Sequence, residues 1–144
     1  MSITHFYETT CGICINMLRE LRDDIRKLKG NIDLQLELHE GREPRLLFER
    51  DVKREIGRGL TSLEHTIRTL HREGCISKEQ YDEAMKNIEK MRSEFKAKNW
   101  RGLANTFYES FDIYRSQLYA WAIEGTFLAC KSYFEKLEKE KKKK

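Results

Sequence analysis

A heptad pattern of apolar side chains in the N-terminal segment limits what this part of the chain can fold into. Its members are spaced alternately by four and three residues: Tyr7, Cys11, Cys14, Leu18, Leu21, Ile25 and Leu28. This spacing is typical of a helix that packs lengthwise on another helix. We therefore predict a helix over 4–29, which Gly30 ends because glycine is the preferred residue just beyond a helix C-terminus.

Two further segments show the same kind of periodicity. The segment 44–73 carries one apolar side: Phe48, Val52, Ile56, Leu60, Leu63, Ile67 and Leu70. The segment 77–98 carries another: Tyr81, Met85, Ile88, Met91 and Phe95. Ser77 followed by Gln80 has the spacing of a capping box, in which the side chain of each residue accepts a hydrogen bond from the backbone N–H of the other. Both segments are predicted to be helices.

The C-terminal segment 100–139 has the longest periodic pattern and the most aromatic residues. Its stripe begins at Trp100 and continues through Leu103, Phe107, Phe111, Tyr114, Leu118, Trp121, Gly125 and Leu128. As one helix it would be about 60 Å long, twice the length of the preceding one. One proline in the chain leaves few places for turns. We predict an all-α, antiparallel bundle of about four helices with one long C-terminal helix.

The stretch 32–39 has two interpretations. Ile32, Leu34, Leu36 and Leu38 alternate with polar residues, which is a strand pattern. A lone strand cannot satisfy its own backbone hydrogen bonds. It is therefore either an extended arm that pairs with a second copy, or a continuation of the first helix driven by leucine and glutamate propensity. We favour a helix or an irregular arm.

The net charge of +4 comes from the last four residues. Lysines occupy 141–144, and removing these 4 from the 28 basic residues leaves 24, which equals the number of acidic residues. The predicted domain, 1–140, therefore lacks the positive field that nucleic-acid binding usually needs. Arg50, Arg54 and Arg58 form a ridge at helical spacing, which together with the lysine tail is the candidate nucleic-acid contact.

Cysteine spacing provides a weak metal candidate. Cys11 and Cys14 form a Cys-x-x-Cys, and His71 and Cys75 lie one helical turn apart, so the four could bind zinc. Without a second paired motif we predict no metal and no cofactor, and we interpret Cys11 and Cys14 as core residues. We expect a cytoplasmic location and hence free thiols, with hyperthermophile proteins as the known exception.

The sequence also contains no candidate membrane-spanning segment, and its composition indicates the kind of organism it comes from. No apolar run reaches the ~18 residues of a membrane span, and no secretory signal pattern opens the chain. Abundant Lys and Glu with scarce Asn and Gln favour a thermophilic source.

Acidic residues and one histidine are the candidates for catalysis. Glu64 and His71 share a helical face, where a carboxylate beside an imidazole could act as an acid–base pair. Glu109, Asp112 and Glu124 are embedded among the aromatic residues of the C-terminal segment. Charged helices carry such residues without any catalytic role, so an enzyme is the least supported class.

These observations favour a non-enzymatic interaction or assembly protein. The aromatic segment offers more apolar surface than one chain of this length can cover. We therefore predict a homo-oligomer, with a dimer as the expected form. A nucleic-acid-binding helical protein and an enzyme with a polar site inside the bundle are the alternatives.

Overall fold

The computed structural model describes residues 3–41 and 46–142, and these residues form six helices and no strand. In chain order the helices are α1 (Ile3–Glu8), α2 (Thr10–Glu40), α3 (Leu46–Arg72), α4 (Lys78–Lys96), α5 (Trp100–Ser110) and α6 (Gln117–Lys142). The predicted all-α class is confirmed. The predicted start of the second helix at Pro44 lies outside the described residues.

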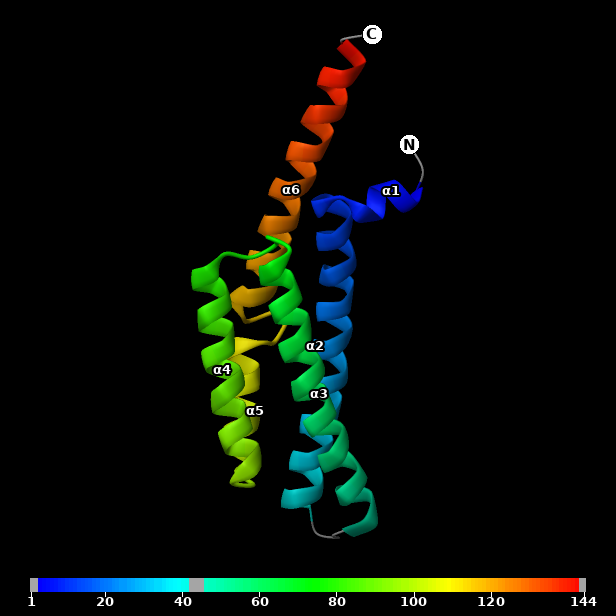
Figure 1. The fold of residues 1–144 in the computed structure, drawn as a ribbon. Helices are drawn as coiled ribbons and strands as arrows, with labels where there is room; N and C mark the ends of the chain where they lie inside the picture. Colours follow the sequence, from blue (N-terminus) through cyan, green and yellow to red (C-terminus); the bar gives the residue numbers. More distant parts are fainter. Residues whose placement is uncertain (1–2, 42–45, 143–144) are drawn as a thin grey trace.

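The antiparallel pair α2 and α3 forms the main axis of the molecule (Figure 1). The heptad residues of α2 and the stripe of α3 face each other and form the core. Leu21, Leu28 and Leu63, for example, have no exposed surface. The periodicity therefore predicted the buried face of α3 correctly from Val52 to Leu70, and most of that of α2. Leu18 is only partly buried, and Tyr7, which belongs to α1, is 50% exposed. Fully burying a leucine such as Leu21 contributes about 1.5–3 kcal/mol relative to an exposed one.

The first predicted helix is wrong at both ends. It is divided at Thr9, whose Oγ1 accepts a hydrogen bond from the N–H of Gly12 and donates one to the carbonyl of Phe6. Beyond this N-cap, α2 continues through Gly30 and ends at Glu40, so 32–39 is helical and the strand arm is wrong. Ile32 is buried against the core, and this packing, together with helix propensity, overrides the period-two pattern.

The predicted C-terminal helix is also divided. Its first part ends as α5, where the N–H of Phe111 bonds to the carbonyl of Phe107. A turn follows in which the carbonyl of Asp112 accepts bonds from the N–H groups of Arg115 and Ser116. Since Phe111 is fully buried at this break, core packing rather than the local pattern explains the change of direction. The longest helix is therefore α2, with 31 residues.

Helices α4 and α5 form a second antiparallel pair beside the first (Figure 1). The predicted capping box is present at the start of α4, where Ser77 and Gln80 exchange hydrogen bonds of 3.2 and 3.0 Å. Asn99 caps α5 by accepting a bond from the N–H of Gly102. Trp100 and Phe107 of α5 are buried in the same core as α2 and α3.

Helix α6 packs along α2 only in its first half. Leu118, Ala122 and Thr126 are its buried residues. Its second half extends past the end of α2, where the short helix α1 lies across the bundle axis (Figure 1). Within the described residues, no helix combines the length and apolarity needed to cross a membrane.

Candidate functional site

The exposed side of α6 carries the most unusual surface of the molecule. Ile123, Phe127 and Phe134 are 46%, 67% and 56% exposed. With the half-buried Cys130 and Leu137 they follow one another at spacings of four, three, four and three residues. We call these five residues the outer stripe. It has the heptad spacing of the residues buried between α2 and α3. It runs along the edge of the face that meets α1 and α2, because Cys130 is bonded to Cys11 and Leu137 lines the cleft between α1 and α6.

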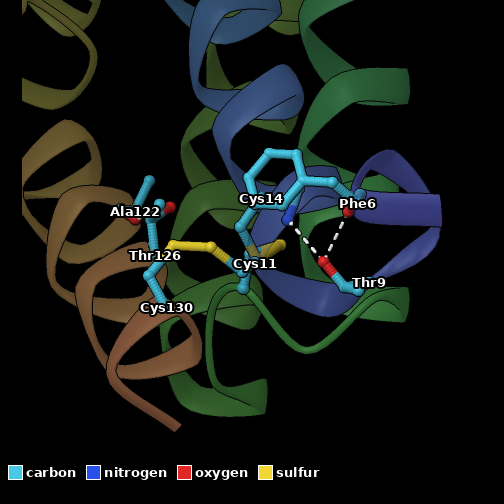
Figure 2. The surroundings of a disulfide bond; sticks show 9 residues. Phe6, Thr9, Cys11, Cys14, Ala122, Thr126 and Cys130 are labelled. Atoms are coloured by element: carbon cyan, nitrogen blue, oxygen red, sulfur yellow. Dashed lines mark hydrogen bonds between the residues drawn. A yellow bond between two sulfur atoms is a disulfide. The ribbon is translucent and has the colours of Figure 1, made fainter. Parts of the chain in front are cut away.

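One disulfide joins the middle of α6 to α2, and a second joins α2 to the turn between α3 and α4. Cys11 at the start of α2 is bonded to Cys130 of α6, and Cys14, one turn further along α2, is bonded to Cys75 in the turn between α3 and α4. Figure 2 shows Cys130 reaching across from α6 to the first turn of α2. The prediction of free thiols is therefore wrong.

The same bonds change the interpretation of the weak zinc candidate. Cys11, Cys14 and Cys75 are all oxidised, so none offers a thiolate for a metal. His71 stacks on the ring of Tyr81 with 4.4 Å between ring centroids. The described residues contain no group of three or more histidine, cysteine or acidic side chains arranged to hold a metal ion.

The acid–base pair predicted on α3 is not formed. The carboxylate of Glu64 lies 3.2 Å from Arg92 of α4 and 3.5 Å from Arg68. It therefore links two helices through partly exposed ion pairs. His71 is engaged with Tyr81 instead. Glu64 therefore joins α3 to α4 through its ion pairs. It does not form a hydrogen-bonded acid–base pair with His71.

The three acidic residues predicted around α5 and α6 lie in different places. Glu109 lines a cleft between α4 and α6, together with Glu83 and Arg115. Asp112 is 6% exposed and lines a shallow depression next to Tyr108. Glu124 is exposed on α6 and lines a cleft together with Trp121 and Leu128. The structure therefore does not assemble these carboxylates into one catalytic site.

A polar cluster that the sequence did not reveal surrounds Tyr108 of α5. Its hydroxyl donates a hydrogen bond to the carboxylate of Asp33 on α2, and the ammonium of Lys29 lies 5.9 Å from its ring. Burial raises the pKa of Tyr108 to about 12, and the hydrogen bond to Asp33 and the negative charges of Asp33 and Asp112 act in the same direction. A phenol with so high a pKa stays protonated at neutral pH, and the cluster joins α5 to α2.

Two further polar contacts lie between α2 and α3. Asp24 accepts hydrogen bonds of 2.7 and 2.6 Å from the hydroxyls of Ser62 and Thr66. Gln35 donates one of 2.9 Å to Glu49, and this bond is the main cause that lowers the pKa of the Glu49 carboxyl. The partners are 38, 42 and 14 residues apart. Local sequence patterns therefore carry no signal for these pairs.

The arginine ridge predicted on 44–73 lies on the surface of α3. Arg50, Arg54 and Arg58 are all exposed on α3. The guanidinium of Arg58 lies 3.0 Å from the carboxylate of Glu55, which offsets part of the positive charge. The ridge is therefore an accessible but partly neutralised surface.

The chain matches no protein-family model, no curated protein and no solved structure.

Proposed function

We propose that the chain is a non-enzymatic assembly protein that self-associates through the outer stripe of α6. The observation that carries the proposal is the exposure of Phe127 and Phe134, which are one heptad apart on a helix extending past its neighbours. The single C-terminal helix of about 60 Å that the sequence predicted is absent, because α5 and α6 are separate helices. Exposed aromatic residues in a row are an interaction surface in their own right.

A second copy of the same helix fits this surface better than an unrelated partner. Apolar residues at heptad spacing pack against another heptad stripe by knobs-into-holes contacts. Glu124 and Lys131 flank the stripe on one edge, seven residues apart. If two α6 helices pair antiparallel, Glu124 of each copy lies near Lys131 of the other. In such a pair the two copies would place opposite charges next to each other along the stripe.

The test is the dependence of mass on concentration in analytical ultracentrifugation. The wild type is expected to shift from monomer to dimer as its concentration rises. The double variant Phe127→Lys/Phe134→Lys is expected to stay monomeric, because each lysine would bury a charged ammonium group in the contact between two outer stripes. Tyr114→Lys is the matched control, since Tyr114 is 88% exposed but lies outside α6. A wild type that stays monomeric at the highest attainable concentration contradicts the proposal.

Nucleic-acid binding is the alternative, and it has the exposed arginine ridge in its favour. Binding through Arg50, Arg54 and Arg58 would weaken steeply with salt, because each phosphate contact releases a counterion. The triple variant with glutamate at these positions would then lose affinity for duplex and single-stranded oligonucleotides. No binding by the wild type at low salt would exclude this alternative.

We also propose a cytoplasmic location in a heat-loving source. Two disulfides in a cytoplasmic protein are unusual, but intracellular proteins of hyperthermophiles are rich in them. The Lys- and Glu-rich composition points the same way. Thermal unfolding of the oxidised protein is the test, and a midpoint above about 90 °C is expected. A midpoint in the ordinary range of about 45–65 °C would argue against a hot source.

A further inference from the structure

The two disulfides differ in their access to solvent. Cys14 and Cys75 are 0% and 1% exposed, so their bridge is enclosed in the core. Cys11 is also buried, but its partner Cys130 is only half-buried and belongs to the outer stripe of α6. A thiol in solution can therefore approach the Cys11–Cys130 bridge from the Cys130 side.

The position of Cys11 makes it the better leaving group of this bridge. It is the second residue of α2, two positions after the N-cap Thr9, whose Oγ1 accepts a hydrogen bond from the N–H of Gly12. The unsatisfied N–H groups and dipole of a helix N-terminus stabilise a thiolate. Cys11 also lines a cleft of about 580 Å³ between α1 and α6. A thiolate released at Cys11 is therefore stabilised by the helix N-terminus and lies beside this cleft.

The Cys11–Cys130 bridge is also the last covalent attachment of α6, and beyond it the ring of Tyr133 packs edge-on against Phe6 of the short helix α1, with 5.6 Å between ring centroids. Every buried residue of this helix precedes position 130, namely Leu118, Ala122 and Thr126. After Cys130, the described residues of α6 are exposed or half-buried. Figure 2 shows the bridge at the point where α6 passes the first turn of α2. Opening it removes the covalent link between these helices and leaves the second half of α6 weakly held.

We propose that Cys11–Cys130 is a redox-active disulfide that exchanges with dithiols in solution while Cys14–Cys75 stays closed. One thiolate of the dithiol attacks the sulfur of Cys130 and forms a mixed disulfide, and Cys11 leaves as a thiolate. The second thiol of the dithiol then displaces Cys130, which takes up a proton. The dithiol is oxidised to its disulfide by two electrons, and the chain gains two thiols.

The test is differential alkylation of the full-length oxidised protein under native conditions. Dithiothreitol is added in rising amounts, free thiols are blocked with N-ethylmaleimide, and labelled sites are mapped by mass spectrometry. The reaction is run at high dilution, because self-association through the outer stripe would cover Cys130. We expect a species with two labels, on Cys11 and Cys130, at dithiol concentrations at least about tenfold below those that label all four. Labelling of Cys14 and Cys75 first, or of all four together, would overturn the inference.

Two double variants separate the bridges. Cys14→Ser/Cys75→Ser keeps only the proposed labile bridge, and Cys11→Ser/Cys130→Ser keeps only the enclosed one. The first is expected to be reduced at least about tenfold faster than the second. Should the first variant fail to fold, the mapping on the wild type still decides. The inference does not rest on self-association, since neither readout requires a dimer.

The structural consequence is tested by hydrogen exchange on the doubly labelled species. Amides of α6 beyond position 130 are expected to exchange about tenfold faster than in the oxidised protein, because the helix has lost its anchor. Amides of the buried face of α2 and α3 serve as the internal control and are expected to keep their protection. Unchanged exchange in α6 would show that the bridge opens without detaching the helix and would overturn that part of the inference.

Discussion

Gly125 of α6 lies directly against the backbone of Cys75: a Cβ atom at position 125 would be 1.8 Å from the Cys75 carbonyl oxygen. That distance is far below van der Waals contact, and the atom it meets is backbone, which cannot rotate away. The absence of a side chain at Gly125 therefore sets how closely α6 approaches the turn between α3 and α4. This turn also carries the Cys14–Cys75 bridge.

The first prediction concerns this contact. Gly125→Ala is expected to destabilise the protein by about 2–4 kcal/mol, because α6 must move away from Cys75 and loosen its packing. Chemical denaturation of the oxidised protein measures the loss. Gly30→Ala is the matched control, since Gly30 lies inside α2 with no atom within 4 Å of the new Cβ. It should stabilise by about 0.5–1 kcal/mol through helix propensity alone. Equal effects of the two substitutions would contradict the close approach.

The second prediction concerns the hydrogen bonds that Asp24 accepts within the α2–α3 interface. Thr66→Val keeps the shape of the side chain but removes the hydroxyl that donates to Asp24 over 2.6 Å. We expect a loss of about 1.5–3 kcal/mol in the free energy of unfolding, as for other bonds to charged groups. Thr61→Val, on the exposed side of the same helix, should change it by less than about 0.5 kcal/mol. If both variants unfold at the same denaturant concentration, the buried bond contributes little.

The third prediction follows from the raised pKa of Tyr108. In the unfolded chain this phenol titrates near 10, whereas in the folded protein its pKa is about 12. At pH values between these two the unfolded state releases the proton and the folded state keeps it, so stability falls as the pH rises. Below pH 10 the contribution is fully present. Tyr108→Phe removes this titration and the bond to Asp33.

The measurement is the free energy of unfolding of both proteins from neutral to strongly alkaline pH. The wild type is expected to be more stable by about 1 kcal/mol at neutral pH. Its advantage should shrink as the pH rises from 10 towards 12. Tyr114→Phe is the control, because Tyr114 is 88% exposed and should follow the wild type throughout. Parallel curves for the wild type and Tyr108→Phe across this range would show that the phenol is not perturbed.

Periodicity in the sequence was enough to predict the all-α class and most of the buried face of α2 and α3. Most residues of the two predicted stripes are buried, and Leu21, Ile25 and Leu63 are fully enclosed, whereas Tyr7 is 50% exposed. This works because the apolar spacing of a helix reports directly on the face that leaves water. The capping box at Ser77 was predictable for a related reason, since both of its partners are local in sequence.

The helix breaks and the disulfides were not predictable in the same way. Apolar spacing continues across the turn after Phe111, so the pattern alone favours one helix; the break depends on burial of Phe111 in the finished core. The partner of Cys11 is 119 residues away. Spacing within Cys-x-x-Cys contains no information about so distant a residue, because the fold alone brings the two together.

The last prediction concerns the direction of the proposed pairing between two copies of α6. In an antiparallel pair, Glu124 of one copy lies near Lys131 of the other, so Glu124→Lys or Lys131→Glu alone places like charges together. Each single variant is expected to weaken the dimer by roughly threefold or more, given about 0.5–1 kcal/mol for exposed ion pairs. The double variant Glu124→Lys/Lys131→Glu restores opposite charges at both positions and should recover the wild-type dissociation constant in sedimentation equilibrium. In a parallel pair Glu124 and Lys131 would face Tyr119 and Thr126 instead, so neither single variant would bring like charges together and neither would weaken the dimer.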